Sequence, residues 1–149
     1  MTTVAVRLSG PNNQWSFSSG GVSQTASDID RVVIPDRSLE NAETKIAELA
    51  ARAEVPPSPR AVNSARSYLR IIFCRAANLG SWSSPHITSS ETGEVVFEWW
   101  HRNKKITLYF GDGEAEFIKV WGTNIQTEMD SGVLADGWPL TSLWLWLHA

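Results

Sequence analysis

Three successive stretches between residues 93 and 122 read as β-strands, in which side chains point to the two faces of a sheet with a period of two residues. They read "EVVFEWW", "KKITLYF" and "EFIKVWG", and the short segments "HRNK" and "GDG" separate them. Connections of this length permit hairpins but no crossover, so neighbouring strands must run antiparallel. The pattern predicts a β-meander whose turns use the tolerance of Asn103, Gly111 and Gly113 for positive φ. A further short strand is expected at residues 86–88.

The adjacent Trp99 and Trp100 do not fit a sheet with one apolar face, because neighbouring residues of a strand point to opposite sides. Trp99 shares its side with Val95 and Phe97, and we expect the helix of residues 59–78 to cover that side. The other side is then also partly apolar and needs a cover. We expect this second face to carry Glu98, Trp100, Lys105, Thr107, Tyr109, Lys119 and either Phe117 or Trp121.

Two helices are expected before the meander. Apolar residues recur at spacings of three and four across residues 39–53, and Ser38 is placed to accept hydrogen bonds from the free N–H groups of the first turn. The prolines of "VPPSP" end this helix. The second helix begins with Ser58 as N-cap and Pro59 as its first residue, follows one apolar stripe and ends at "NLG".

The last segment, "GWPLTSLWLWLHA", predicts a short helix that begins at Pro139. Leu140, Leu143, Trp144 and Leu147 would share one side of it. This helix is one internal candidate to cover the second face of the sheet, and the N-terminal residues are the other. If either docks there, the aromatic residues of that face are structural. If neither does, the sheet offers a surface to a partner.

The domain organisation follows from a change of pattern near residue 38. Residues 1–37 are expected as an N-terminal arm in which "VAVRL", "QWSFS" and "RVVIP" form short strands around the loop-like "SFSSGGVSQTAS". Residues 38–149 are expected as a single domain. Its fold class is α+β: two helices packed on an antiparallel β-meander of three to five strands, with a short C-terminal helix.

Composition narrows the classes of function. The chain has 149 residues and a net charge of −3, which suits one domain and gives no overall attraction to nucleic acid or an anionic membrane. Cys74 is the single cysteine, and residues 1–30 lack the pattern of a signal peptide. No apolar run approaches the length of a membrane helix. We therefore expect a cytoplasmic protein without a membrane partner.

Catalytic and metal chemistry find little support in the sequence. The three histidines, His86, His101 and His148, match no metal-binding spacing. "GDG" belongs to no phosphate-binding or nucleophile motif, and the acidic residues after it suit a polar hairpin tip. Cys74 lies near arginines but has no catalytic partner motif. We expect no enzyme activity, no metal site and no cofactor.

Tryptophan is the unusual feature, because eight of the 149 residues are Trp. Trp offers a large apolar contact area and is enriched at the energetic centres of protein interfaces. The basic segment "HRNKK" lies beside the paired tryptophans and adds charges that could steer a partner. The predicted partner-binding residues are Trp99, Trp100, Arg102, Lys104, Lys105, Tyr109, Trp121, Trp144 and Trp146.

The order "PPSPRAV", a proline before the short strand in "PHI", and then "GEVVFEWW" resembles a group of small bacterial proteins with a meander that contains a Glu-Trp strand. The resemblance covers residues 55–129 and concerns the scaffold, so no functional residue is carried over. It implies a bacterial origin. Because such proteins often occur in two-gene operons or mobile elements, it also implies an antitoxin-like or anti-defence binding role. The long N-terminal arm and the Trp-rich tail depart from the group.

These observations predict a non-catalytic module that binds a protein: a toxin, a defence or nucleic-acid-processing complex, or a second copy of the chain. The alternative is nucleic-acid binding by the hairpin from Trp100 to Tyr109. Its rings would stack on bases while its cations meet phosphates. Titration with oligonucleotides at low salt, where screening is least, separates the two hypotheses.

Overall fold

The structure is a computed structural model that describes residues 7–8, 15–16, 37–135 and 138–149. The chain divides into two compact units, Met1–Ile34 and Pro35–Ala149. In the first unit, β1 (Arg7–Leu8) pairs antiparallel with β2 (Trp15–Ser16). Both strands fall within stretches expected to be strands, "VAVRL" and "QWSFS". The third expected strand, "RVVIP", lies outside the described residues.

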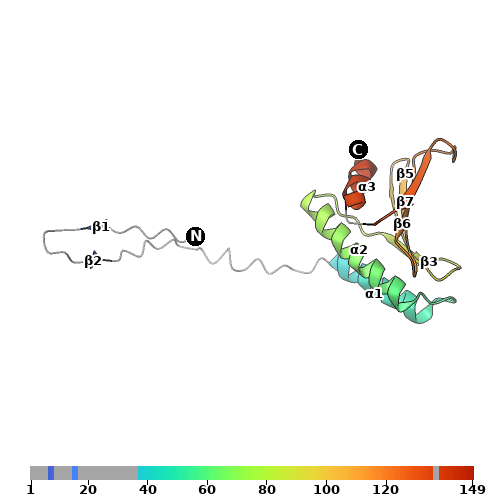
Figure 1. Ribbon diagram of the computed structural model, residues 1–149, viewed down its shortest axis with the longest axis horizontal. Helices are drawn as coiled ribbons and strands as arrows, with labels where there is room; N and C mark the ends of the chain where they lie inside the picture. Colours follow the sequence, from blue (N-terminus) through green and yellow to red (C-terminus); the bar gives the residue numbers. More distant parts are fainter. Residues whose placement is uncertain (1–6, 9–14, 17–36, 136–137) are drawn as a thin grey trace. The chain divides into compact units, whose positions relative to one another are not determined.

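The second unit begins with two helices that pack against each other, α1 (Arg37–Arg52) and α2 (Pro59–Asn78) (Figure 1). The Ser58 hydroxyl accepts a hydrogen bond from the Ala61 N–H at 3.1 Å and caps α2. Gly80, just beyond the helix, has a φ of +66°. The predicted beginning and end of α2 are therefore confirmed.

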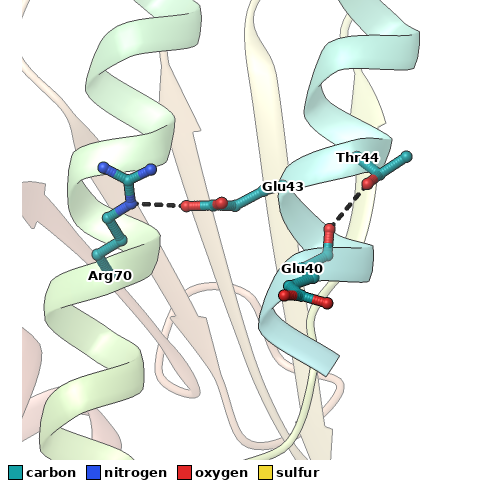
Figure 2. Close-up of polar contacts among 4 residues, drawn as sticks. All are labelled: Glu40, Glu43, Thr44 and Arg70. Carbon is teal, nitrogen blue, oxygen red and sulfur yellow. Dashed lines mark hydrogen bonds and ion pairs between the residues drawn. The ribbon is translucent and has the colours of Figure 1, made fainter. Parts of the chain in front are cut away.

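Side chains join α1 to α2 and to the connector that follows α2. Arg70 Nε donates to Glu43 Oε1 at 2.6 Å, as Figure 2 shows, and this contact raises the pKa of Arg70. Ser38, expected as an N-cap, lies inside the first turn of α1. Its hydroxyl instead accepts a hydrogen bond from Trp82 Nε1–H at 2.6 Å. The prediction for Ser38 was wrong because the helix begins before it.

The remaining strands form one antiparallel sheet in chain order, which confirms the predicted meander. The strands are β3 (His86–Ser89), β4 (Val95–His101), β5 (Lys104–Phe110), β6 (Glu116–Val120) and β7 (Met129–Val133). Each strand pairs with the next along the chain. The sheet therefore has two edges, β3 and β7.

The hairpin turns differ in detail from the prediction. Between β4 and β5, Arg102 adopts the positive φ, at 55°, whereas Asn103 donates through Nδ2 to the Trp121 carbonyl at 2.9 Å. The left-handed conformation costs a non-glycine residue about 1–2 kcal/mol. Neither Gly111 nor Gly113 has a positive φ. The turn after β5 therefore does not use the conformational freedom that we expected of its glycines.

The hydrophobic core lies between the helices and one face of the sheet. Helix α3 (Trp138–His148) buries the four residues that its sequence pattern placed on one side. It packs with α2 against β4 and β5, and the Trp144 ring meets the Trp99 ring edge-on at 5.7 Å. All three helices therefore lie on the same side of the sheet (Figure 1). The idea that α3 covers the second face is wrong, because its apolar side completes the same core as α2.

Candidate functional site

The strand register assigns each side chain to a face, because residues paired across antiparallel strands point to the same side. Trp99 pairs with Ile106 on the helix-covered face, and Trp100 pairs with Lys105 on the other face. The three helices of residues 37–135 and 138–149 all pack on the first face and leave the second uncovered, so we call the second the open face. The open face consists of His86, Thr88, Val96, Glu98, Trp100, Lys105, Thr107, Tyr109, Glu116, Ile118, Val120, Met129, Ser131 and Val133.

Much of the open face is apolar. Trp100 is 56% exposed and Val133 is 42% exposed. The surrounding side chains alone reduce the exposure of Thr107, at the centre of β5, to 5%. Other apolar or aromatic members of the face are half-buried: Tyr109, Ile118, Val120 and Met129. Polar residues, among them Glu98, Lys105 and Ser131, lie between these apolar ones. A mixed surface with exposed apolar residues is typical of a site that another protein covers.

Polar contacts hold the Trp100 end of the open face in place. Glu98 forms an ion pair with Lys105, and His86 Nδ1 lies 3.4 Å from Glu98 Oε2. Lys105 Nζ also lies 5.1 Å from the centroid of the Trp100 ring, in a cation–π contact. On the other side of Trp100, the His86 ring of β3 lies 6.0 Å from the Trp100 ring, measured between centroids. Trp100 is thus an ordered surface residue, which lowers the entropy that a binding partner must remove.

An acidic hollow of about 310 Å³ lies at the opposite end of the strands. The Ser58 hydroxyl, which caps α2, donates to Asp112 at its rim. Tyr109 and Glu116 line the hollow and also belong to the open face, so the two are continuous. None of the hollow's carboxylates forms an ion pair with another residue in the described part of the chain. Those carboxylates belong to Glu94, Asp112, Glu114 and Glu116.

The structure divides the predicted partner-binding residues between the core, the helix side and the open face. Trp99 and Trp144 are 3% and 4% exposed and pack against each other in the core. Trp99 Nε1–H donates to the Ser83 carbonyl at 2.9 Å, and Trp144 Nε1–H donates to the Ser81 hydroxyl at 2.8 Å. Both indoles are therefore satisfied within the fold, and we remove them from the candidate surface.

Three further predicted residues lie together on the helix side. The rings of Trp121 and Trp146 meet at 5.9 Å, and Lys104 Nζ donates to the Trp146 carbonyl at 2.9 Å. This contact places a cation beside the C-terminal end of α3, where the helix dipole favours positive charge. These contacts of Lys104, Trp121 and Trp146 thus stabilise the packing of α3 on the sheet. The predicted residues that remain on the open face or at its end are Trp100, Arg102, Lys105 and Tyr109.

The assignment of faces along β6 was wrong. Phe117 pairs with Leu108 and Lys119 pairs with Ile106, so both point to the helix side. The alternation of "EFIKVWG" was visible, but its phase relative to β5 depends on the loop between them, for which the sequence has no clear signal. The strand β7 was not predicted because "MDSGV" alternates weakly. The open face therefore gains residues that sequence reasoning missed: Ile118, Val120, Met129 and Val133.

The open face offers contacts rather than reactive groups. Among the residues that the structure describes, no three His, Cys, Asp or Glu side chains are arranged to hold a metal ion. The described helices include none with the length and apolar character that crossing a membrane requires. The rings of His101 and His148 lie 5.1 Å apart on the helix side, away from the open face.

Comparison of the chain with protein-family models, curated proteins and solved structures finds no match.

Proposed function

We propose that this chain is a non-catalytic protein-binding module and that the open face is its binding surface. The observation that carries the proposal is the uncovered sheet face, on which Trp100 is the most exposed aromatic side chain of the described residues. Trp is enriched among the residues that contribute most of the binding energy at protein interfaces, and neighbouring residues hold this indole in place. Apolar residues of β6 and β7 extend the surface around Trp100 across the sheet.

The polar contacts favour a protein over nucleic acid as the partner. Of the cations expected to meet phosphates, Lys105 pairs with Glu98 and Lys104 points to the helix side. Arg102 remains at the hairpin tip, and the acidic hollow at the other end repels a phosphate backbone. Nucleic-acid binding by the hairpin from Trp100 to Tyr109 is therefore the weaker candidate.

For the class of partner we adopt what the resemblance to small bacterial proteins implies. A toxin or a defence complex in a bacterial cytoplasm suits a small binding module that acts by covering a surface. Cys74 is exposed and has no second cysteine in the chain, which agrees with a reducing compartment. We include the cytoplasmic location and the antitoxin-like or anti-defence role in the proposal.

Site-specific photo-cross-linking in the source cells tests the proposal. A photoreactive amino acid would replace Trp100 or Ile118 on the open face, or the exposed Ile71 and Leu145 on α2 and α3 as controls. We expect both open-face positions to cross-link the same protein and the control positions not to do so. The purified partner should then lose affinity for a Trp100→Ser, Tyr109→Ser double variant whose thermal unfolding is nearly unchanged.

Two results would count against the proposal. The first is equal cross-linking from the helix positions and the open-face positions. The second is an adduct with nucleic acid alone, combined with tight binding of purified chain to oligonucleotides at low salt, which would favour the alternative.

A further inference from the structure

We propose that a second copy of this chain occupies the open face, with the two sheets packed face to face about a two-fold axis that runs across the strands. The inference rests on the proposed function, because it names one occupant of the same surface. It comes from the distribution of charge on the face. With the axis across the strands, opposite charges of the two copies meet, whereas an axis along the strands would bring like charges together.

The two ends of the open face carry different charges. One end has the acidic hollow lined by Glu94, Asp112, Glu114 and Glu116. The other end has Lys105 and, at the tip of the β4–β5 hairpin, Arg102. Within residues 37–135 and 138–149, no described residue forms an ion pair or hydrogen bond with the Arg102 side chain. Each copy therefore presents carboxylates without an ion-pair partner at the end with the hollow. At the hairpin end it presents Arg102, which also has no ion-pair partner among the described residues.

A two-fold axis along the strands would place the acidic ends of the two copies against each other. An axis across the strands reverses the second copy, so that the acidic end of each copy meets the basic end of the other. Face-to-face sheets pack about 10 Å apart with strands about 30° from parallel, a separation that lets side chains of this length meet. Like-charge repulsion excludes the first arrangement and favours the second.

The spacing of residues along the strands supports the same arrangement. Thr107 is the central residue of β5, and Arg102 precedes it by as many residues as Asp112 follows it. Rotation about an axis through Thr107 therefore brings Arg102 of one copy to the end of the strands where the acidic hollow of the other lies. Glu116 faces the second copy there, whereas Asp112 accepts a hydrogen bond from the Ser58 hydroxyl on the helix side. The same operation places Lys105 opposite Tyr109, where an ammonium group can meet the ring face. It also sets Glu98 opposite its own counterpart, and the ion pair with Lys105 neutralises that charge within each copy.

Apolar residues meet in this arrangement as well. On β7, the rotation brings Met129 of one copy opposite Val133 of the other, and on β4 it brings Trp100 opposite Val96. Ile118, near the middle of the face, meets its own counterpart close to the axis. The most exposed apolar side chains of the open face are thus covered by apolar side chains of the second copy.

The size of the face sets the expected strength. Five strands about 4.8 Å apart, each contributing about five residues of about 3.4 Å, give roughly 400 Å² of planar area per copy, or about 800 Å² for the pair. This total is below that of standard stable interfaces and belongs to weak, transient ones, so we expect a dimer that dissociates on dilution through roughly 100 micromolar.

Charge exchange between two variants of the full chain tests the inference. Arg102→Glu alone places two acids together at both ends of the dimer, and Glu114→Arg alone places two cations together. A mixture of the two variants restores one opposite-charge pair at each end. We expect each variant to dimerise at least ten-fold more weakly than the unaltered chain, and the mixture to recover heterodimers. Sedimentation or light scattering across a dilution series measures this.

The controls use the same changes of charge on α1. Lys45→Glu and Glu48→Arg lie on an exposed side of that helix and should leave the dimer unchanged. Ile118→Lys, which sets two cations against each other near the axis, should give a monomer with an unchanged circular dichroism spectrum. Because each copy carries a net charge of −3, added salt screens the overall repulsion and the end contacts together, so charge exchange is the sharper test.

A chain that stays monomeric at roughly millimolar concentration would overturn the inference, as would a dimer that ignores Ile118→Lys or a mixture that fails to recover heterodimers. The outcome is separate from that of the proposed function. A monomer whose open face still cross-links another protein would refute the second copy and leave the binding role standing. A monomer without such an adduct would refute both.

Discussion

At the scale of single residues, the neighbouring Trp99 and Trp100 have opposite environments. Trp99 points into the core, where its ring meets those of Phe97 and Trp144 edge-on. Trp100 points to the open face, and Lys105 is the cation over its ring. The period of two along β4 separates the two side chains, and the position of the helices decides which one is buried.

Substitution of each of these residues by alanine should have different effects on stability. Trp99→Ala removes a buried indole and leaves a cavity, so we expect the free energy of unfolding to fall by about 3–5 kcal/mol. Trp100→Ala removes an exposed ring, and we expect a change of less than about 1 kcal/mol. Urea unfolding of dilute protein measures both, and equal losses would contradict the assignment of faces.

The sequence was sufficient to predict that these two residues diverge, because alternation depends only on the backbone of one strand. It was insufficient to predict that Trp99 and Trp144 are core residues rather than contacts for a partner. Their burial requires α3 to dock on β4 and β5, and that contact joins segments far apart in the chain. Sequence reasoning placed Trp99 and Trp144 on a partner-binding surface because it could not foresee this long-range packing.

At the scale of elements, the helices were predicted well because their signals are local. Ser58 and Gly80 mark the ends of α2, and apolar spacing marks its buried side. The side of the sheet on which α3 packs has no local signal, because an apolar helix suits either face. The phase of β6 relative to β5 has none either, since one residue more or fewer in the loop exchanges the faces.

The edge strand β7 allows a test by pH. Lys119 Nζ lies 3.0 Å from Asp130 Oδ2 across β6 and β7, and this hydrogen bond and charge lower the pKa of Asp130 below its ordinary value of 3.8. A lowered folded-state pKa means that the stabilisation is complete above the unfolded value and is lost as the pH falls through the folded value. Asp130→Asn should therefore be less stable than the unaltered chain at pH 7.

Thermal unfolding between about pH 2 and pH 7 checks this expectation. The difference between the Asp130→Asn variant and the unaltered chain should shrink below about pH 4 and vanish at the acidic limit. Glu48→Gln on α1 removes a carboxylate that forms no ion pair with another described residue, and it serves as the control. A difference that is the same at both ends of the range would show that the ion pair contributes nothing.

At the scale of the whole molecule, the unit Pro35–Ala149 places three helices on one face of a five-stranded sheet and none on the other. A two-layer arrangement of this kind buries one face and leaves the other to water or to a partner. The apolar and aromatic residues on the uncovered face, together with its acidic and basic ends, are what the binding role and the second copy both depend on.

Hydroxyl-radical footprinting of the full chain in dilute solution tests this central claim most directly. With rates normalised to those of the unfolded chain, Trp100, Tyr109 and Met129 should be oxidised readily, while Trp99 and Trp144 should be protected. At high concentration, Trp100 and Met129 should become protected as a second copy covers them. Protection of Trp100 and Met129 in the dilute chain, to the same extent as Trp99, would show that the chain itself covers the face and would contradict the account.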